Sequence, residues 1–137
     1  MDHHCNWILT CIGYRNYRYF LQFIFYSELL LIYYSSFFTE SVLWNDLMEK
    51  PSVGLNFYFK SLNWVFCLSF SFLLGLLNIF HFGVLLGKNL STIEFCEDKK
   101  DKGKYTKNFF KNWIEIMGRN PICWIIPICT KNNYSGT

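Results

Sequence analysis

Two long apolar stretches dominate the pattern of hydrophobic and polar positions along the chain. They run over residues 19–38 and 62–86. A helix of about 20 apolar residues crosses the hydrocarbon core of a lipid bilayer. The pattern therefore predicts two transmembrane helices at these positions. Their main polar interruptions are Gln22, Ser27 and Glu28 in the first stretch, and Asn63, Asn78 and His81 in the second.

The more polar segments around these spans indicate how the chain is oriented in the membrane. Residues 1–18 form a short start, 39–61 connect the spans and 87–137 form a tail. Arg15 and Arg18 precede the first span, two basic residues lie in the connection, and nine follow the second span. Short cytoplasmic flanks collect Lys and Arg. We therefore predict that both ends are cytoplasmic and that the connection is lumenal or extracellular.

Composition supports the membrane class. Of the 137 residues, 52% are hydrophobic, 21% are aromatic and only 17% are charged. This balance is too apolar for most soluble domains. The expected partners therefore include membrane lipid and no nucleic acid. Five of the six cysteines lie in the segments predicted to be cytoplasmic, where thiols stay reduced, so they indicate metal ligands, nucleophiles, acylation sites or buried side chains.

The first eleven residues carry the most chemical information. Cys5 has an imidazole two residues earlier, at His3, and a carboxylate beside that imidazole, at Asp2. Such a set supplies a nucleophile, a base and a group that orients the base. His4 and Cys11 remain as candidate ligands of a tetrahedral zinc ion. Taken alone, the segment fits a fragment of another zinc module equally well.

The surrounding residues match a known family. After the Asp-His-His-Cys string come Trp7, Cys11, Gly13, Asn16 and a Tyr-Arg-Tyr-Phe run that leads into the first span. A Ser91-Thr92-Ile93-Glu94 motif follows the second span, and the tail carries Tyr105, Asn112, Gly118, Trp124 and Pro127. In these motifs and in their order, the chain resembles the DHHC-type (Asp-His-His-Cys) zinc-finger protein S-acyltransferases, or palmitoyltransferases.

The resemblance implies a fold. Family members have four transmembrane helices and a cysteine-rich domain that holds two zinc ions. The fold class implied here is an all-α membrane protein with two transmembrane helices. A partial cysteine-rich zinc motif at 1–18 precedes them and a short cytoplasmic tail at 87–137 follows. We therefore expect the chain to be the C-terminal portion of such an enzyme, beginning at an internal methionine.

The resemblance also implies roles for the residues of the motif. Cys5 would accept the acyl group, His3 would deprotonate it, and Asp2 would orient His3. His4 and Cys11 would share a zinc ion in a site that is incomplete within this chain. Thr92, Glu94 and Asn112 would give structural support, and Phe20, Phe23 and Leu30 would line a cavity for the acyl chain. Helical spacing of the last three residues, with Ser27, is also typical of plain helix packing.

The implied function is a protein-cysteine S-palmitoyltransferase. It would move a fatty acyl group from acyl-coenzyme A, such as palmitoyl-CoA, to cysteine-containing protein substrates through an acyl-cysteine intermediate. The implied location is a multi-pass position in the endoplasmic reticulum or Golgi membrane. The alternative is a truncated, non-catalytic membrane fragment or adaptor derived from such an enzyme.

Several further residues allow both a functional and a structural interpretation. Glu28 is an acid within a span, which marks a candidate functional site, although a hydrogen bond to helices outside this chain explains it better. His81 and Asn78 share a helix face and could form a polar patch, but residues of this kind usually bond to a neighbouring helix. The tail lysines at 99–111 are best interpreted as a solvated surface. Cys123 and Cys129 are best interpreted as buried side chains.

Overall fold

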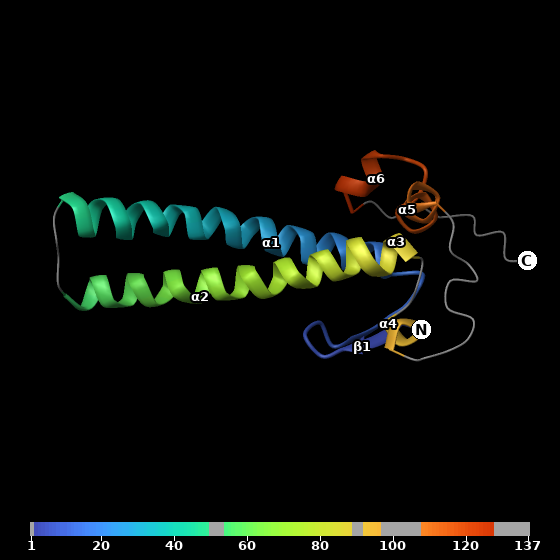
Figure 1. The fold of residues 1–137 in the computed structure, drawn as a ribbon, viewed down its shortest axis with the longest axis horizontal. Helices are drawn as coiled ribbons and strands as arrows, with labels where there is room; N and C mark the ends of the chain where they lie inside the picture. Colours follow the sequence, from blue (N-terminus) through green and yellow to red (C-terminus); the bar gives the residue numbers. More distant parts are fainter. Residues whose placement is uncertain (1, 50–53, 89–91, 97–107, 128–137) are drawn as a thin grey trace, which may run out of the picture. The chain divides into compact units, whose positions relative to one another are not determined.

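The computed structural model describes residues 2–49, 54–88, 92–96 and 108–127. The chain divides into two compact units. Unit 1 comprises Met1–Phe23 with Asn78–Thr137, and unit 2 comprises Ile24–Leu77. Most of the described residues are helical, as predicted. Figure 1 labels β1 and the helices α1 to α6.

Unit 1 begins with a β-hairpin, so the all-α class predicted for the chain is wrong at this point. Strands β1 (His3–Cys5) and β2 (Thr10–Ile12) are antiparallel, and His4 lies opposite Cys11. The backbone N–H of Asp2 extends the pairing by donating to the carbonyl of Ile12 at 2.7 Å. Strands of three residues are too short for their alternation to be recognised in a sequence.

Asn16 joins the hairpin to the first long helix, α1 (Tyr17–Thr39). Its side-chain oxygen accepts from the backbone N–H of Gly13 at 2.7 Å, and its amide donates to the carbonyl of Cys11 at 2.9 Å. Its own carbonyl accepts from the N–H of Phe20 at 3.1 Å, which is the first helical bond. One side chain therefore sets where the hairpin ends and the helix begins.

The other described parts of unit 1 include several short helical segments. These are the π-helical η2 (Ile79–Leu85), α3 (Leu86–Lys88), α4 (Thr92–Cys96), α5 (Phe109–Met117) and α6 (Ile122–Ile125). Asn112 is fully buried and donates to the carbonyl of Gly87 at 3.0 Å, which fixes α5 against α3. Gly118, with φ 90°, ends α5 in a conformation that favours glycine. Trp124 of α6 then donates to the Gly118 carbonyl at 2.8 Å.

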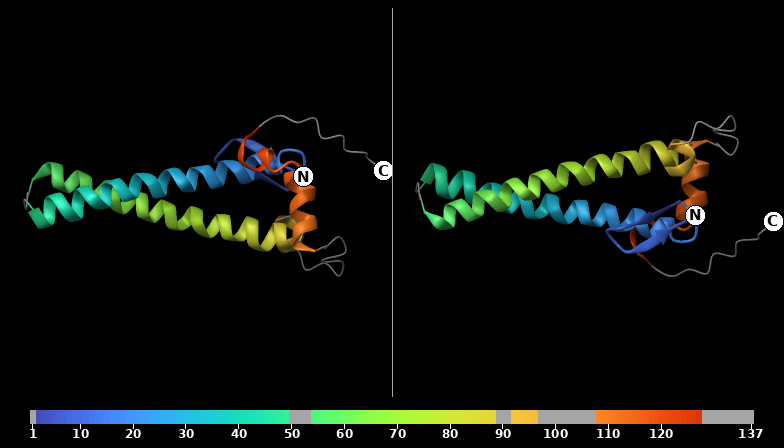
Figure 2. Two further views of the ribbon diagram at one scale, coloured as in Figure 1. Left: turned by 90° about the horizontal axis from the view of Figure 1, so that it is seen from above. Right: turned by 90° about the horizontal axis from the view of Figure 1, so that it is seen from below.

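Unit 2 contains the remainder of α1, the π-helical η1 (Glu40–Glu49) and all but the last residue of α2 (Leu55–Asn78). Figure 2 shows the two long helices from above and below. Hydrogen bonds between described side chains join these two helices. Ser71 donates to Glu28 at 2.8 Å, and Trp64 donates to Thr39 at 2.8 Å. Glu28 therefore has a partner on the other span, and its bond is not made only to helices outside this chain.

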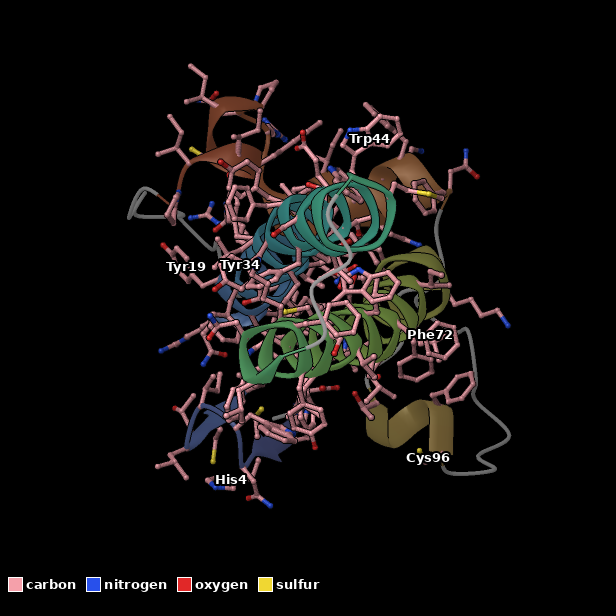
Figure 3. All side chains as sticks on the ribbon, turned by 90° about the vertical axis from the view of Figure 1, so that its left-hand side faces the viewer. His4, Tyr19, Tyr34, Trp44, Phe72 and Cys96 are labelled. Atoms are coloured by element: carbon pink, nitrogen blue, oxygen red, sulfur yellow. The ribbon has the colours of Figure 1, made fainter. Side chains whose placement is uncertain are left out.

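The helices extend beyond the predicted spans. Tyr17–Val42 and Leu55–Lys88, of 26 and 34 residues, are long and apolar enough to cross a membrane by length and composition. Much of the segment predicted as a connecting loop, 39–61, is therefore helical. No residue of α2 is buried, and large side chains such as Phe72 project outward from it (Figure 3). Lipid or other helices would cover such a surface.

Candidate active site

The β-hairpin separates the chemically active side chains into two faces. Successive residues of a strand point to opposite sides, so His3 and Cys5 share one face of β1 while His4 occupies the other. The register places Cys11 on the face of His4. Burial follows the same division, since Cys5 is 8% exposed while His4 and Cys11 are exposed. His4 projects outward in Figure 3.

Asp2 links the hairpin to α4 through its carboxylate. One oxygen, Oδ2, lies 2.5 Å from Nδ1 of His3. The same oxygen accepts from the hydroxyl of Thr92 at 2.7 Å, and Oδ1 accepts from the Thr92 backbone N–H at 2.5 Å. A residue that follows the second span thus fixes a carboxylate near the start of the chain.

The pKa of Asp2 reflects two opposing effects. Burial alone would raise the pKa, but the hydrogen bonds from His3 and Thr92 together outweigh burial and hold the pKa below its ordinary value of 3.8. Asp2 is therefore ionised at neutral pH. An ionised carboxylate at Nδ1 favours the tautomer that carries a proton there, which leaves Nε2 of His3 free to accept a proton.

The imidazole of His3 also contacts two rings. Its centroid lies 5.5 Å from that of Phe20, edge to face, and 6.2 Å from that of His81. His81 in turn lies 2.9 Å from the hydroxyl of Tyr17, measured from Nδ1. His81 thus bonds across to another helix, as predicted for a polar residue in a span. These rings form the buried surroundings of the Asp2–His3 pair.

The predicted zinc ligands His4 and Cys11 lie together on the exposed face of the hairpin. Nδ1 of His4 is 3.4 Å from Sγ of Cys11. Zinc bonds of about 2.0–2.1 Å to nitrogen and about 2.3 Å to sulfur, at a tetrahedral angle, separate the two atoms by about 3.5 Å. The pair therefore fits one edge of a zinc tetrahedron. Within the described ranges, no three His, Cys, Asp or Glu side chains gather into a metal site.

The residues predicted to line an acyl cavity lie in different surroundings. Phe20 is 5% exposed and packs against His3, whereas Phe23 and Leu30 are 51% and 66% exposed. Phe23 belongs to unit 1 and Leu30 to unit 2. The support residues Thr92 and Asn112 both make the contacts described above. The structure does not describe the side chain of Glu94. Ser91 and residues 97–107, which include Tyr105, also lie outside the described residues.

Comparison with known proteins identifies the family. The chain matches the family model of the DHHC palmitoyltransferases over residues 1–99. The chain belongs to the DHHC palmitoyltransferase family. Members of this family are membrane proteins, in agreement with the two long apolar helices.

Curated relatives of this DHHC chain come from animals, plants and yeasts. It is 36% identical to palmitoyltransferase ZDHHC15 of Rattus norvegicus, over 93% of the chain and 39% of the relative. It is 30% identical to probable protein S-acyltransferase 15 of Arabidopsis thaliana, over 99% of the chain and 57% of the relative. It is 33% identical to palmitoyltransferase PFA3 of Debaryomyces hansenii, over 96% of the chain and 38% of the relative. The chain thus spans less than two thirds of the length of these relatives.

Sequence reasoning missed Tyr17 in this DHHC chain. The sequence shows it only as part of the aromatic run that leads into the first span, yet it is buried and bonds to His81, 64 residues away. The available signal was the polar His81 near the C-terminal end of an apolar span, because a buried imidazole needs a hydrogen-bonding partner. The sequence could not show which residue supplies that partner.

Proposed function

We propose that the protein is a protein-cysteine S-palmitoyltransferase and that Cys5 is its nucleophile. The observation that carries this proposal is the Asp2–His3 pair on the same face of β1 as the buried Cys5. A thiol near an oriented imidazole base is the arrangement that activates a cysteine for acyl transfer. Membership of the DHHC palmitoyltransferase family supports the choice of acyl group.

The first half-reaction acylates Cys5. Nε2 of His3 takes the thiol proton, and the thiolate attacks the carbonyl carbon of the acyl-coenzyme A thioester. The bond from that carbon to the coenzyme A sulfur breaks, and the imidazolium returns its proton to the departing sulfur. Asp2 stabilises the imidazolium that forms between these events. The products are acyl-Cys5 and coenzyme A.

The second half-reaction transfers the acyl group to a substrate protein. His3 deprotonates a cysteine thiol of that protein, whose sulfur attacks the acyl-Cys5 carbonyl. The bond to the Cys5 sulfur breaks, and the imidazolium protonates Cys5. One thioester replaces another in each half-reaction. The protein therefore contributes mainly positioning and thiolate activation.

A zinc ion bound by His4 and Cys11, with further ligands, would fix the exposed face of the hairpin. Structural zinc sites contribute binding energy directly to folding. The 3.4 Å separation of the two side chains supports this role. Because His4 and Cys11 face away from His3 and Cys5, the ion would hold the hairpin and would take no part in acyl transfer.

Three further assignments complete the proposal. Thr92 holds Asp2 by hydrogen bonds, and Asn112 holds α5 against α3. Glu94, in the same motif as Thr92, also gives structural support. Phe20, Phe23 and Leu30 contact the fatty acyl chain. The protein lies in the endoplasmic reticulum or Golgi membrane. Both ends of the chain face the cytoplasm, where palmitoyl-CoA and cysteine-containing substrate proteins are available.

Labelling with an alkyne analogue of palmitate tests this function. The full gene product, expressed in membranes, should carry a hydroxylamine-sensitive label and pass it to an acceptor protein. Cys5→Ser should abolish the transfer, whereas Cys96→Ser, which changes an exposed thiol outside the site, should leave it unchanged. Transfer that survives Cys5→Ser would refute the assignment.

A further inference from the structure

A buried polar pair lies beside the imidazole of His3. Tyr17, in the first turn of α1, is 7% exposed, and His81, in η2, is 3% exposed. The Tyr17 hydroxyl and Nδ1 of His81 are 2.9 Å apart. Buried polar groups are costly unless they are hydrogen-bonded, and a satisfied pair fixes the orientation of both side chains. The reaction proposed above gives neither residue a role.

His81 of this pair is in ring contact with the proposed base. His81 lies 6.2 Å from His3 between ring centroids and 5.0 Å from Phe20, which itself lies 5.5 Å from His3. The three rings therefore touch one another. Protein interiors are close-packed, so a rotation of the His81 ring would displace the imidazole of His3.

The same contacts continue to the residue that holds Asp2. Phe80 packs against His81 at 5.5 Å and against Phe95 at 5.1 Å. Phe95 belongs to α4, the helix that begins with Thr92. One side of His3 is therefore fixed by the hydrogen bonds that Asp2 makes to His3 and to α4. Another side is fixed by packed rings that also extend to α4.

We propose that Tyr17 and His81 are positioning residues for acyl transfer. Their hydrogen bond fixes the His81 ring, and the His81 ring, together with Phe20, sets where the imidazole of His3 lies relative to Cys5. An apolar residue of the same volume in place of Tyr17 would fill the space but would let the His81 ring turn. The proposal rests on the proposed function, because His3 needs a fixed position only if it acts on Cys5.

The test measures the rate constant of Cys5 acylation at saturating palmitoyl-CoA, together with KM and the thermal midpoint. Tyr17→Phe removes one hydroxyl and keeps the ring. It should lower the rate constant about tenfold or more, because small misplacements of a reacting group have effects of this size, with KM changed less than twofold. Tyr33→Phe, at a residue 73% exposed, is the matched control and should behave as the unsubstituted protein.

Variants of His81 separate positioning from general stability. His81→Asn keeps an amide near the position of Nδ1 that can bond to Tyr17, whereas His81→Leu does not. His81→Asn should therefore retain more of the rate constant than His81→Leu, and this advantage should vanish when Tyr17→Phe is also present. A purely structural role would lower the thermal midpoint without this dependence on Tyr17.

The outcomes distinguish this inference from the proposed function. A wild-type rate constant in Tyr17→Phe, or an advantage of His81→Asn that persists without the Tyr17 hydroxyl, overturns the positioning role alone. An unsubstituted protein that never forms acyl-Cys5 overturns the proposed function, and the positioning role with it.

Discussion

Thr92 offers a sharp test of how the carboxylate of Asp2 is held. Its hydroxyl donates at 2.7 Å to Oδ2, the oxygen that also contacts His3. Thr92→Val removes this donor with almost no change in volume, and the backbone N–H bond to Oδ1 remains available. Thr92→Ser keeps the hydroxyl and is the matched control.

The size of the effect follows from the charge of the acceptor. A hydrogen bond to a charged group contributes about 1.5–3 kcal/mol. If about 1 kcal/mol of this acts on the orientation of His3 in the transition state, the rate constant of Cys5 acylation falls about fivefold, since 1.36 kcal/mol is tenfold. Single-turnover acylation at saturating palmitoyl-CoA measures this rate constant. Equal rate constants for Thr92→Val and Thr92→Ser would refute this reasoning.

Thr92→Val should also change how stability depends on pH. The folded protein holds the pKa of Asp2 below 3.8, so the ionised carboxylate contributes stability above that pH, and the contribution is lost as pH falls through the lowered pKa. Removal of a donor moves the pKa of Asp2 upward. The loss begins near the unfolded pKa of 3.8 in both variants, and its size depends on how far the folded pKa lies below that value. Thermal midpoints measured in detergent should therefore decrease less on acidification through this range in Thr92→Val than in Thr92→Ser.

Three further predictions concern the rest of the chain. Glycosylation acceptor sites introduced near Asn45 should be modified in microsomes and sites near Lys102 should not, and the reverse pattern would contradict a cytoplasmic Cys5. Cys11→Ala should lower the zinc content of the purified protein and its thermal midpoint, and an unchanged zinc content would remove Cys11 from the ligand set. Ser71→Ala, which breaks the bond to the carboxylate in α1, should destabilise the helix pair by about 0.5–1.5 kcal/mol. Ser69→Ala should not, because the described hydrogen bond of the Ser69 hydroxyl is to the Val65 carbonyl of the same helix, and equal effects of the two substitutions would contradict a role for the interhelical bond.

The long helices and the Asp-His-His-Cys string were predictable because their signals are local. A run of some 20 apolar residues needs no partner to be recognised, and the spacing of Asp2, His3 and Cys5 is contained in four positions. The site was predictable through family resemblance only where its residues belong to a motif. Thr92 was found in this way, although its bond to Asp2 spans 90 residues.

The remaining features depend on contacts that a single sequence does not reveal. The hairpin strands have three residues each, too few for a period of two to stand out. Asn16 acts through bonds to two backbone groups of the hairpin. The pairing of Tyr17 with His81 arises only when two helices meet. Helix continuation past residue 39 also escaped prediction, because acidic and polar residues there reduce the apolar signal without breaking a helix.

The most direct test of the central claim locates the acyl group itself. The protein is exposed briefly to palmitoyl-CoA, digested, and analysed by mass spectrometry, with a parallel sample chased with an acceptor protein. We predict palmitate on the peptide that contains Cys5 and its disappearance during the chase. In His3→Ala the rate of acyl-Cys5 formation should be lower by a factor of about 100 or more. Palmitate confined to other cysteines, or acyl-Cys5 that persists through the chase while the acceptor becomes labelled, would contradict the account.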